Sequence, residues 1–377
     1  MASAIPGTLG FRIHHTPRRV GSVRPEHANH AHRFEQLANA TLDLGKLPEQ
    51  LLEALVCLVP FDAYCWGAVD PLSLLPTRAT GTTLTAGSPQ LWEVQDLVAH
   101  QLEPRDIGSV ARSGRSVALL SEIIEKDQSP IYQRILRPNG LEHQLRAALV
   151  LDGSHWGMLN IERRADRSDF SPGEVALVDA LVPYLAHAFR RWLLAEPSHL
   201  YSAPRSVLPG VIVLDEDNEV DSISPEAESW LSEWGFSDLT TPPAAIAAVV
   251  AAARARADGR WDSTPSARLR LPSGAWLHVR ATHLNRPNEP ARTAIVLDRA
   301  STEQVAPMVA RAHQLSARET QIALLVLRGL STSEIAGQLF ISSYTVQDHL
   351  KSIFEKVDVR SRRELATDIF EPHTKQA

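Results

Sequence analysis

The last stretch of the chain, residues 314–370, constrains its fold more than any other feature, because it predicts four short helices in succession. Three of the predicted helix starts have capping-box spacing, with a serine followed three residues later by glutamate: Ser316 and Glu319, Ser331 and Glu334, and Ser361 and Glu364. The first helix ends at Gly329, a residue suited to the left-handed conformation that terminates helices. Only residues 340–342 separate the second helix (332–339) from the third (343–357), which predicts the steep crossing of a helix-turn-helix.

The third of these helices has one apolar stripe at helical spacing, formed by Val346, Leu350, Ile353 and Val357. The side chains predicted to face outward are Tyr344, Gln347, Asp348 and Lys351. Amide, carboxylate and ammonium groups near a helix N-terminus can distinguish base edges in a major groove of DNA. The pattern therefore predicts a recognition helix. The alternative is a small structural bundle with a solvated polar face.

These motifs resemble the C-terminal DNA-binding domain of LuxR-type transcriptional regulators. Residues 315–319 match the opening motif of that family, residues 329–336 its middle, and residues 342–350 its recognition helix. The resemblance implies DNA contacts from Ser343, Tyr344, Thr345, Gln347, Asp348, His349, Lys351 and Arg362. Within this set it places Gln347, Asp348 and Lys351 at base edges, and Thr345, His349 and Arg362 at the DNA backbone or in local structure.

One departure from the LuxR-type pattern concerns charge. Gln347 stands where the family commonly has lysine, and Asp348 adds a negative charge beside it. Since attraction to phosphates depends on basic side chains, we expect weaker non-specific DNA binding. The specificity of binding, rather than its existence, is what this departure affects.

The composition is that of a cytoplasmic, multidomain globular protein. A length of 377 residues predicts two to four domains, and a net charge of −6 argues against an indiscriminate polyanion binder. Cys57 and Cys65 are the only cysteines, which excludes a disulfide framework and a four-cysteine zinc site. We expect no membrane association, because the sequence has neither a signal-peptide pattern nor an apolar run of bilayer length.

Residues 1–28 are predicted to form a flexible tail, because glycine, proline, histidine and arginine occur there without periodicity. Five histidines in or near this tail raise the hypothesis of a metal site: His14, His15, His27, His30 and His32. No cysteine or carboxylate supplements them at ligand spacing, so no metal site is predicted.

Residues 29–195 predict an α+β domain. Helical periodicity covers residues 33–44 and 47–59, and strand patterns follow at 63–69, 145–151 and 156–162. A long helix then starts near Ser171 and ends near residue 194. The segments HWGMLNIERR and DFSPGEVALVDALVPYLAHAFR resemble the end of GAF domains, which implies a sensor or dimerisation module.

Aromatic side chains in this GAF-like domain are candidates for lining a ligand cavity. Tyr64 and Trp66 share one face of a predicted strand, and Trp156 and Met158 share one face of another, because side chains alternate along strands. The alternative, which we favour, is that they fill an ordinary core. Cys57 and Cys65 are candidates for redox sensing, although buried cysteines are usually inert.

A Pro- and Ser-rich linker over residues 196–208 precedes a second α+β domain, residues 209–300. Its opening strands (211–214 and 220–223) and the helix that follows Ser224 resemble a PAS domain. An alanine-rich helix (244–257) and three strands (267–271, 275–283 and 293–297) complete it. Trp230 and Trp276 could line a pocket or fill the core. A second linker, residues 301–313, is predicted to lead into the all-α domain at 314–377.

Catalytic motifs are absent: the sequence has no phosphate-binding GxxxxGK[ST] loop, no GxSxG elbow, no HExxH and no dinucleotide-binding GxGxxG after a strand. We therefore predict a dimeric, non-enzymatic DNA-binding transcriptional regulator, modulated by a small-molecule signal in the GAF-like or PAS-like domain. Its expected partners are double-stranded DNA, a second copy of the chain and, as a further candidate, RNA polymerase; no cofactor is evident. One alternative is a ligand-independent regulator whose N-terminal domains only dimerise or dock a partner. A remote alternative is an enzyme with a GAF-like pocket.

Overall fold

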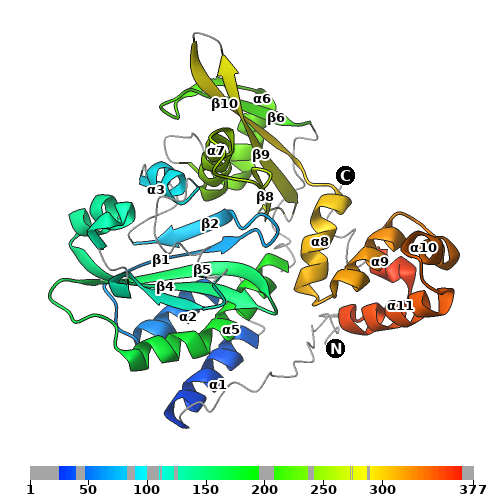
Figure 1. Ribbon diagram of the computed structural model, residues 1–377, viewed down its shortest axis with the longest axis horizontal. Coiled ribbons are helices and arrows are strands. Elements are labelled where there is room, and N and C mark those ends of the chain that lie inside the picture. Colours follow the sequence, from blue (N-terminus) through cyan, green and yellow to red (C-terminus); the bar gives the residue numbers. More distant parts are fainter. Residues whose placement is uncertain are drawn as a thin grey trace, which may run out of the picture.

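The chain folds into two five-stranded antiparallel sheets, each with helices packed on it, followed by a helical C-terminal domain (Figure 1). The computed structural model describes residues 25–39, 47–82, 90–99, 110, 113–122, 126–194, 208–236, 242–271, 273, 275–286 and 289–366. The architecture of two α+β domains and one all-α domain confirms the predicted fold class. Most of the predicted tail, the linker up to residue 207 and the end of the fourth C-terminal helix lie outside these described residues.

The first sheet has the strand order β2-β1-β5-β4-β3. Its strands are β1 (Ala63–Val69), β2 (Pro76–Gly81), β3 (Val117–Leu119), β4 (Leu141–Leu151) and β5 (Ser154–Arg164). Helices α1 (Pro25–Asn39), α2 (Leu47–Val56) and α5 (Pro172–Leu194) lie on one side of this sheet, and α3 (Gln90–Ala99) lies on the other (Figure 1). Short turns complete the domain: three 3-10 helices at Leu120–Glu122, Lys126–Gln128 and Arg137–Asn139, and a π-helix at Tyr132–Leu136.

The predicted helices and strands of this domain are confirmed, with shifted ends. Strand β1 has the predicted bounds, whereas β4 and β5 are longer than predicted. Helix α1 begins at Pro25, so the last residues assigned to the flexible tail are helical and that boundary was wrong. The apolar residues that recur at helical spacing explain this, since Phe34 and Ala38 are completely buried.

A β-bulge overturns one expected relationship in this sheet. The register between β4 and β5 shifts between Leu149 and Val150, so that Trp156 and Met158 do not follow simple alternation. Trp156 packs in the same hydrophobic cluster as helix α5, whereas Met158 packs with Ala79 and with helix α7 (Ala244–Ala257) of the second domain. The prediction that Trp156 and Met158 share one face is therefore wrong.

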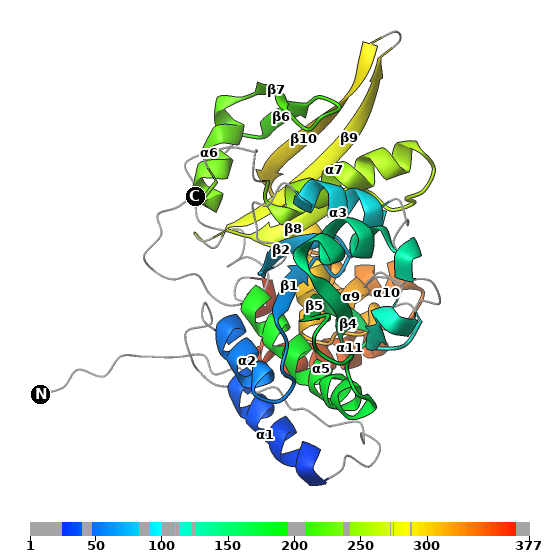
Figure 2. The same ribbon diagram turned by 90° about the vertical axis from the view of Figure 1, so that its left-hand side faces the viewer.

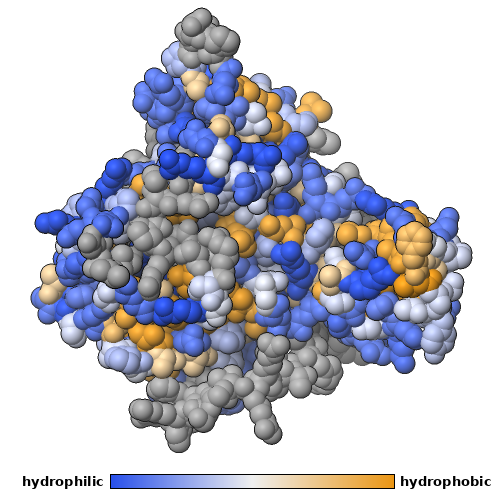
Figure 3. Space-filling model, in the orientation of Figure 1, coloured by the Kyte–Doolittle hydropathy of each residue, from blue (hydrophilic) through white to orange (hydrophobic). Residues whose placement is uncertain are grey.

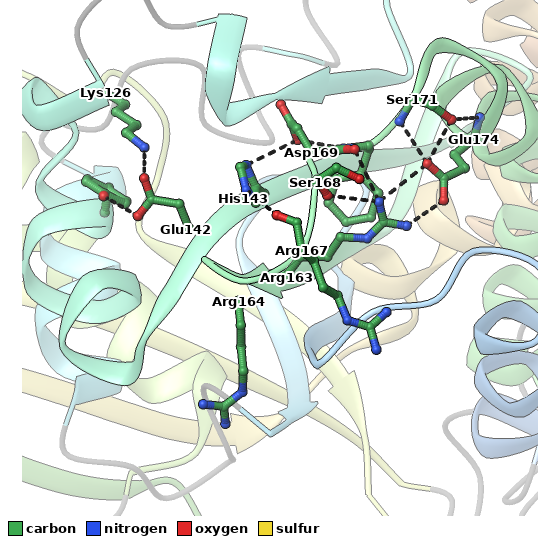
Figure 4. A network of polar contacts seen from close by, with 12 residues as sticks. Lys126, Glu142, His143, Arg163, Arg164, Arg167, Ser168, Asp169, Ser171 and Glu174 are labelled. Atoms are coloured by element: carbon green, nitrogen blue, oxygen red, sulfur yellow. Dashed lines mark hydrogen bonds and ion pairs between the residues drawn. The ribbon is translucent and has the colours of Figure 1, made fainter.

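A polar network fixes the start of α5 on this sheet (Figure 4). The guanidinium of Arg163, at the end of β5, is almost fully buried and pairs with the carboxylate of Glu174. It also donates to the carbonyl oxygens of Pro60 (2.8 Å) and Ser168 (3.3 Å). Ser171 and Glu174 form a reciprocal cap, since the Ser171 amide donates to Glu174 Oε2 (2.8 Å) and the Glu174 amide donates to Ser171 Oγ (3.3 Å). These bonds explain why the long helix starts where the sequence predicts.

The second sheet repeats the strand order of the first, with β7-β6-β10-β9-β8. Its strands are β6 (Gly210–Leu214), β7 (Val220–Ile223), β8 (Ser266–Arg270), β9 (Trp276–Arg286) and β10 (Glu289–Arg299). Helix α6 (Pro225–Trp234) follows β7 and starts at Ser224, whose side chain accepts a hydrogen bond from the Ala227 amide. Strands β9 and β10 extend as a long hairpin beyond the rest of the molecule (Figures 1 and 2).

Helix α7 (Ala244–Ala257) joins the two α+β domains into one body. Up to Ala253 it is apolar around its whole circumference, because Ile246 and Val249 pack on the second sheet while Ala244 and Ala247 pack against Ala79 of β2. A helix that is hydrophobic on every side is expected to be buried, and here it lies between the two domains. The alanine-rich segment was predicted as a helix, but its role between two domains was not.

Polar contacts accompany this apolar junction. Arg78 of β2 donates to the carbonyl oxygen of Arg270 in β8 (2.6 Å), and its guanidinium lies 4.6 Å from the centroid of the Trp192 ring. The completely buried carboxylate of Asp70 accepts from the Arg268 amide (2.8 Å). Both hydrogen bonds, from Arg78 to Arg270 and from the Arg268 amide to Asp70, join the first domain to the second.

Residues 301–313 form a helix, so the prediction of a linker there is wrong. Helix α8 (Thr302–Ala312) starts with a capping box between Ser301 and Gln304, and its buried side chains include Val305, Met308 and Val309. These side chains belong to one hydrophobic cluster that runs from α5 through α8 into the C-terminal domain. The capping-box spacing was present in the sequence, but Pro307 within the helix obscured it.

Candidate nucleic-acid interface

The C-terminal domain consists of α9 (Ala317–Leu327), α10 (Thr332–Leu339), α11 (Ser343–Val357) and α12 (Arg362–Glu364). Reciprocal capping boxes start α9 and α10, as predicted. At α12 the Ser361 side chain accepts from the Glu364 amide, but the Glu364 carboxylate accepts from the Arg360 amide instead of the Ser361 amide. The three caps satisfy backbone donors that would otherwise lack partners, and they set the angles at which the helices begin.

Helix α11 has one buried and one exposed face. Val346, Leu350, Ile353 and Val357 are at most 5% exposed and form the predicted stripe against α9 and α10. Of the eight predicted DNA contacts, Ser343, Tyr344, Gln347, Asp348 and Lys351 are exposed, and Thr345, His349 and Arg362 are half-buried. The exposed face of α11 is therefore open for binding along its first two turns.

Two of the three half-buried members of the predicted set, Thr345 and Arg362, have structural partners. Thr345 donates its amide to Ser342 Oγ (3.0 Å), and the two hydroxyl groups lie 2.8 Å apart. Arg362 donates to the carbonyl oxygen of Leu330 (2.8 Å) and to Thr332 Oγ1 (2.7 Å). Its guanidinium thus joins α12 to the start of α10, which favours a positioning role for Arg362 over a direct contact with DNA.

A buried carboxylate fixes α11 on α9. Glu319 is 4% exposed and accepts from Lys356 Nζ (2.7 Å), Ser352 Oγ (2.7 Å) and the Ser316 amide (2.6 Å). Burial alone would raise the pKa of Glu319, but the hydrogen bonds, led by that from Lys356, lower it to about 2. The carboxylate therefore stays ionised at neutral pH and holds the recognition helix in place.

The C-terminal domain carries no net charge. Residues 313–368 have seven cationic side chains (Arg318, Arg328, Lys351, Lys356, Arg360, Arg362, Arg363) and seven anionic ones (Glu319, Glu334, Asp348, Glu355, Asp358, Glu364, Asp368). Lys356 and Arg362 are further engaged within the domain by the bonds above. Because phosphate attraction scales with available basic groups, base contacts must supply a large share of any DNA affinity.

A shallow groove of about 520 Å³ adjoins the exposed face of α11. Its lining includes Gln347 and Lys351 of α11, Thr332 of α10 and Arg362 of α12. Two of the predicted base-contacting side chains therefore border a concave surface.

The domain contacts the rest of the chain through α8 (Figure 1). Arg328 at the end of α9 pairs with Glu303 of α8 (3.0 Å). His313, at the end of α8, lies near Arg190 of α5; burial and that positive charge lower the pKa of His313 to about 4. Among the described residues, the side chains predicted to contact bases stay exposed in this arrangement.

The aromatic residues proposed to line ligand cavities lie in the cores of the two α+β domains. Trp66, Trp156, Trp230 and Trp276 are at most 2% exposed, and the Trp66 ring meets Phe189 edge-on with centroids 5.0 Å apart. Tyr64 is half-buried beside that same cluster, and Met158 is half-buried near α7. The geometry agrees with the core interpretation for the tryptophans, and a ligand-lining role stays a prediction.

The two cysteines differ in their surroundings. Cys57 is exposed, contrary to the apolar environment that its sequence neighbours indicate, whereas Cys65 is buried. Burial, aided by the charge of Glu162, raises the pKa of Cys65 to about 12. A thiol with that pKa is almost entirely protonated at neutral pH, which disfavours a nucleophilic role.

The described residues contain neither a cluster of metal-ligand side chains nor a helix able to span a membrane. Within that part of the chain, no group of three or more His, Cys, Asp or Glu side chains is placed to hold a metal ion; His14 and His15 lie outside it. No helix within the same ranges has the length and apolar character needed to cross a bilayer.

Comparison with solved structures finds similarity at a low level to SdiA and to a GAF-domain protein. SdiA of Escherichia coli is 12% identical, with a TM-score of 0.33, over 92% of this chain and 97% of that one. The GAF domain/HD domain protein of Geobacter sulfurreducens is 21% identical, with a TM-score of 0.30, over 40% of this chain and 95% of that one.

Sequence comparison identifies the C-terminal domain. Residues 313–368 match the family described as bacterial regulatory proteins, luxR family. The spore germination protein GerE of Bacillus subtilis is 33% identical over 55 residues, which are 15% of this chain and 74% of GerE. The transcriptional regulator MalT of Serratia proteamaculans is 31% identical over 68 residues, but this chain spans only 8% of its length. The chain belongs to the luxR family of bacterial regulatory proteins.

Proposed function

We propose that this chain is a dimeric, sequence-selective transcriptional regulator in which the N-terminal body controls a C-terminal DNA-binding domain. The observation that carries the proposal is the two-sided character of α11: an apolar stripe is buried, and Gln347, Asp348 and Lys351 stand on the free side. A helix presented in this way matches the geometry with which helix-turn-helix proteins enter a major groove. Two copies would read half-sites about one helical turn apart.

Control by a small-molecule signal is the second part of the proposal. One hydrophobic cluster connects α5, α8 and α9. A conformational change in the first domain can therefore be transmitted through packed side chains to the DNA-binding domain. Helix α7 connects the second domain to the same body. A ligand that prefers one arrangement of these elements would shift the population of paired DNA-binding domains.

A ligand-independent regulator is the competing candidate, and a specific observation favours it. The tryptophans that could line a cavity are packed in the cores, with at most 2% of their surface exposed. In that case the α+β body would serve dimerisation or partner docking alone. Heat-unfolding scans with the small-molecule fraction of a bacterial extract separate the candidates, because a ligand that binds only the folded chain raises Tm.

The experiment that tests DNA reading is selection of bound fragments from random double-stranded DNA at a fixed salt concentration. The full chain is expected to enrich a spaced, inverted-repeat motif, and Gln347→Ala and Lys351→Ala should each weaken binding to it by about 1–3 kcal/mol. Gln321→Ala, an exposed change on α9, is the matched control and should bind like the parent. Equal binding by the parent and both α11 variants would overturn the assignment of these side chains.

A further inference from the structure

Two exposed aromatic side chains lie at the N-terminal end of the recognition helix. Phe340 is 94% exposed and Tyr344 is 73% exposed, the largest values among the large apolar and aromatic side chains that the structure describes. Figure 3 shows hydrophobic atoms gathered on the edge of the C-terminal domain where α10 meets α11. Isolated exposed apolar residues need no explanation, but two within five positions beside a binding face do.

The backbone at Phe340 makes its identity informative. Phe340 ends α10 in the left-handed conformation, with φ of 55°. Glycine or asparagine adopts that conformation at lower cost than a residue with a bulky side chain, so a phenylalanine here destabilises the turn. Neither folding nor packing benefits, because the ring is almost fully exposed. The Phe340 ring is therefore available for a contact with another molecule.

The position of the Phe340 and Tyr344 rings indicates which molecule they contact. Tyr344 precedes Gln347, Asp348 and Lys351 on the free side of α11, and Phe340 precedes the helix by one short turn. Both rings thus adjoin the surface that faces DNA under the proposed function. That surface lacks excess positive charge, since the domain has equal numbers of cationic and anionic side chains. Apolar contact is a way to add affinity at this edge without further positive charge.

The major groove offers one apolar group, the 5-methyl of thymine, and apolar side chains contact it in base readout. We propose that Phe340 and Tyr344 contact thymine methyl groups at the outer end of each half-site and so determine specificity there. This inference rests on the proposed function and adds that the site selects thymine at these positions. It predicts thymines at a fixed distance from the bases read by Gln347 and Lys351.

The test replaces thymine by deoxyuridine, which removes only the methyl group, in the motif selected by the full chain. We expect binding to weaken by about fourfold for each contacted methyl lost, from the usual contribution of one buried carbon. The double variant Phe340→Asn, Tyr344→Ala should bind the thymine and deoxyuridine sites equally. Asparagine suits the left-handed backbone at position 340, so this variant keeps the turn intact.

Leu208→Ala is the control, because Leu208 is 64% exposed and lies just before the second domain, outside the DNA-binding domain; it should keep the parent's preference for thymine. A parent chain that selects a motif but binds its thymine and deoxyuridine forms equally would overturn the inference and leave the proposed function standing. So would a double variant that retains the parent's preference for thymine over deoxyuridine. Absence of any selected motif would overturn both proposals.

Discussion

Lys356 of α11 donates a 2.7 Å hydrogen bond to the buried carboxylate of Glu319 on α9, and this pair joins the recognition helix to the first helix of its domain. The same carboxylate accepts from Ser352 of α11 and from the amide that starts α9. One side chain thus serves as a helix cap, an ion-pair partner and a tie between two helices.

The first prediction concerns pH. The pKa of Glu319 is about 2 in the folded chain against an ordinary value of 4.5, so its contribution is fully present above pH 4.5 and is lost as the pH falls toward 2. Glu319→Gln should lower the free energy of local unfolding of α9 and α11 by about 3 kcal/mol at neutral pH. It should also flatten the loss of stability in acid. Hydrogen exchange of amides in these helices measures both effects.

Glu334→Gln is the control for this change, because Glu334 holds the same capping-box position at α10 but is exposed. Its replacement should have a clearly smaller effect and leave the acid dependence of α9 and α11 unchanged. If Glu319→Gln and Glu334→Gln lower stability by the same amount, the buried ion pair between Glu319 and Lys356 stabilises the domain no more than an exposed helix cap does.

The second prediction compares two neighbouring arginines of β5 (Figure 4). Arg163 is buried and bonded to Glu174 and to backbone carbonyls, whereas Arg164 is exposed. Arg163→Ala leaves the half-buried carboxylate of Glu174 and two backbone carbonyl oxygens without their donor, and should lower the free energy of unfolding by about 3 kcal/mol. Arg164→Ala should change it by less than about 0.5 kcal/mol. Urea denaturation followed by tryptophan fluorescence gives both values.

The third prediction concerns Asp348. Its carboxylate stands on the free side of α11 beside two predicted base contacts, where it repels phosphates. Asp348→Asn should raise affinity for random DNA several-fold at low salt, and the gain should shrink as salt screens the charge. Titrations of labelled random duplex at several salt concentrations measure the effect. Asp358→Asn removes the same charge at the far end of α11, at a left-handed position that asparagine tolerates, and should produce little gain.

The fourth prediction separates positioning from DNA contact at Arg362. Arg362→Lys keeps the charge but cannot form both hydrogen bonds to Leu330 and Thr332, so hydrogen-exchange protection of α10 should fall by about 1 kcal/mol. The salt dependence of DNA binding should stay the same. Arg363→Lys, an exposed neighbour, should alter neither quantity. Arg362→Gln, which removes the charge, should also leave the salt slope unchanged; a reduced slope for this variant would instead assign the guanidinium to a phosphate.

The DNA-binding domain was predictable because its signals are local. Caps, helix ends and the stripe from Val346 to Val357 each lie within a few residues, and α10 and α11 have their predicted bounds. The exposed position of Phe340 was not predictable, since an aromatic residue between two helices usually packs inward.

The N-terminal body shows the limits of local patterns. The opposite orientations of Trp156 and Met158 follow from a bulge that depends on the pairing of β4 with β5. Helix α8 was missed although Ser301 and Gln304 signal its start, because Pro307 interrupts the pattern. The burial of α7 on all sides depends on a neighbouring domain, which no window of sequence contains.

That alanine-rich helix has a mechanical consequence. A leucine or methionine in α7 could change rotamer and absorb a small shift of one sheet, but alanine has no side-chain rotamer to change. Eight of the buried residues of α7 are alanines, and they touch both domains directly. Close-packed interiors of this kind transmit displacement instead of damping it. The two sheets are therefore stiffly coupled, so that a displacement of one sheet is transmitted to the other.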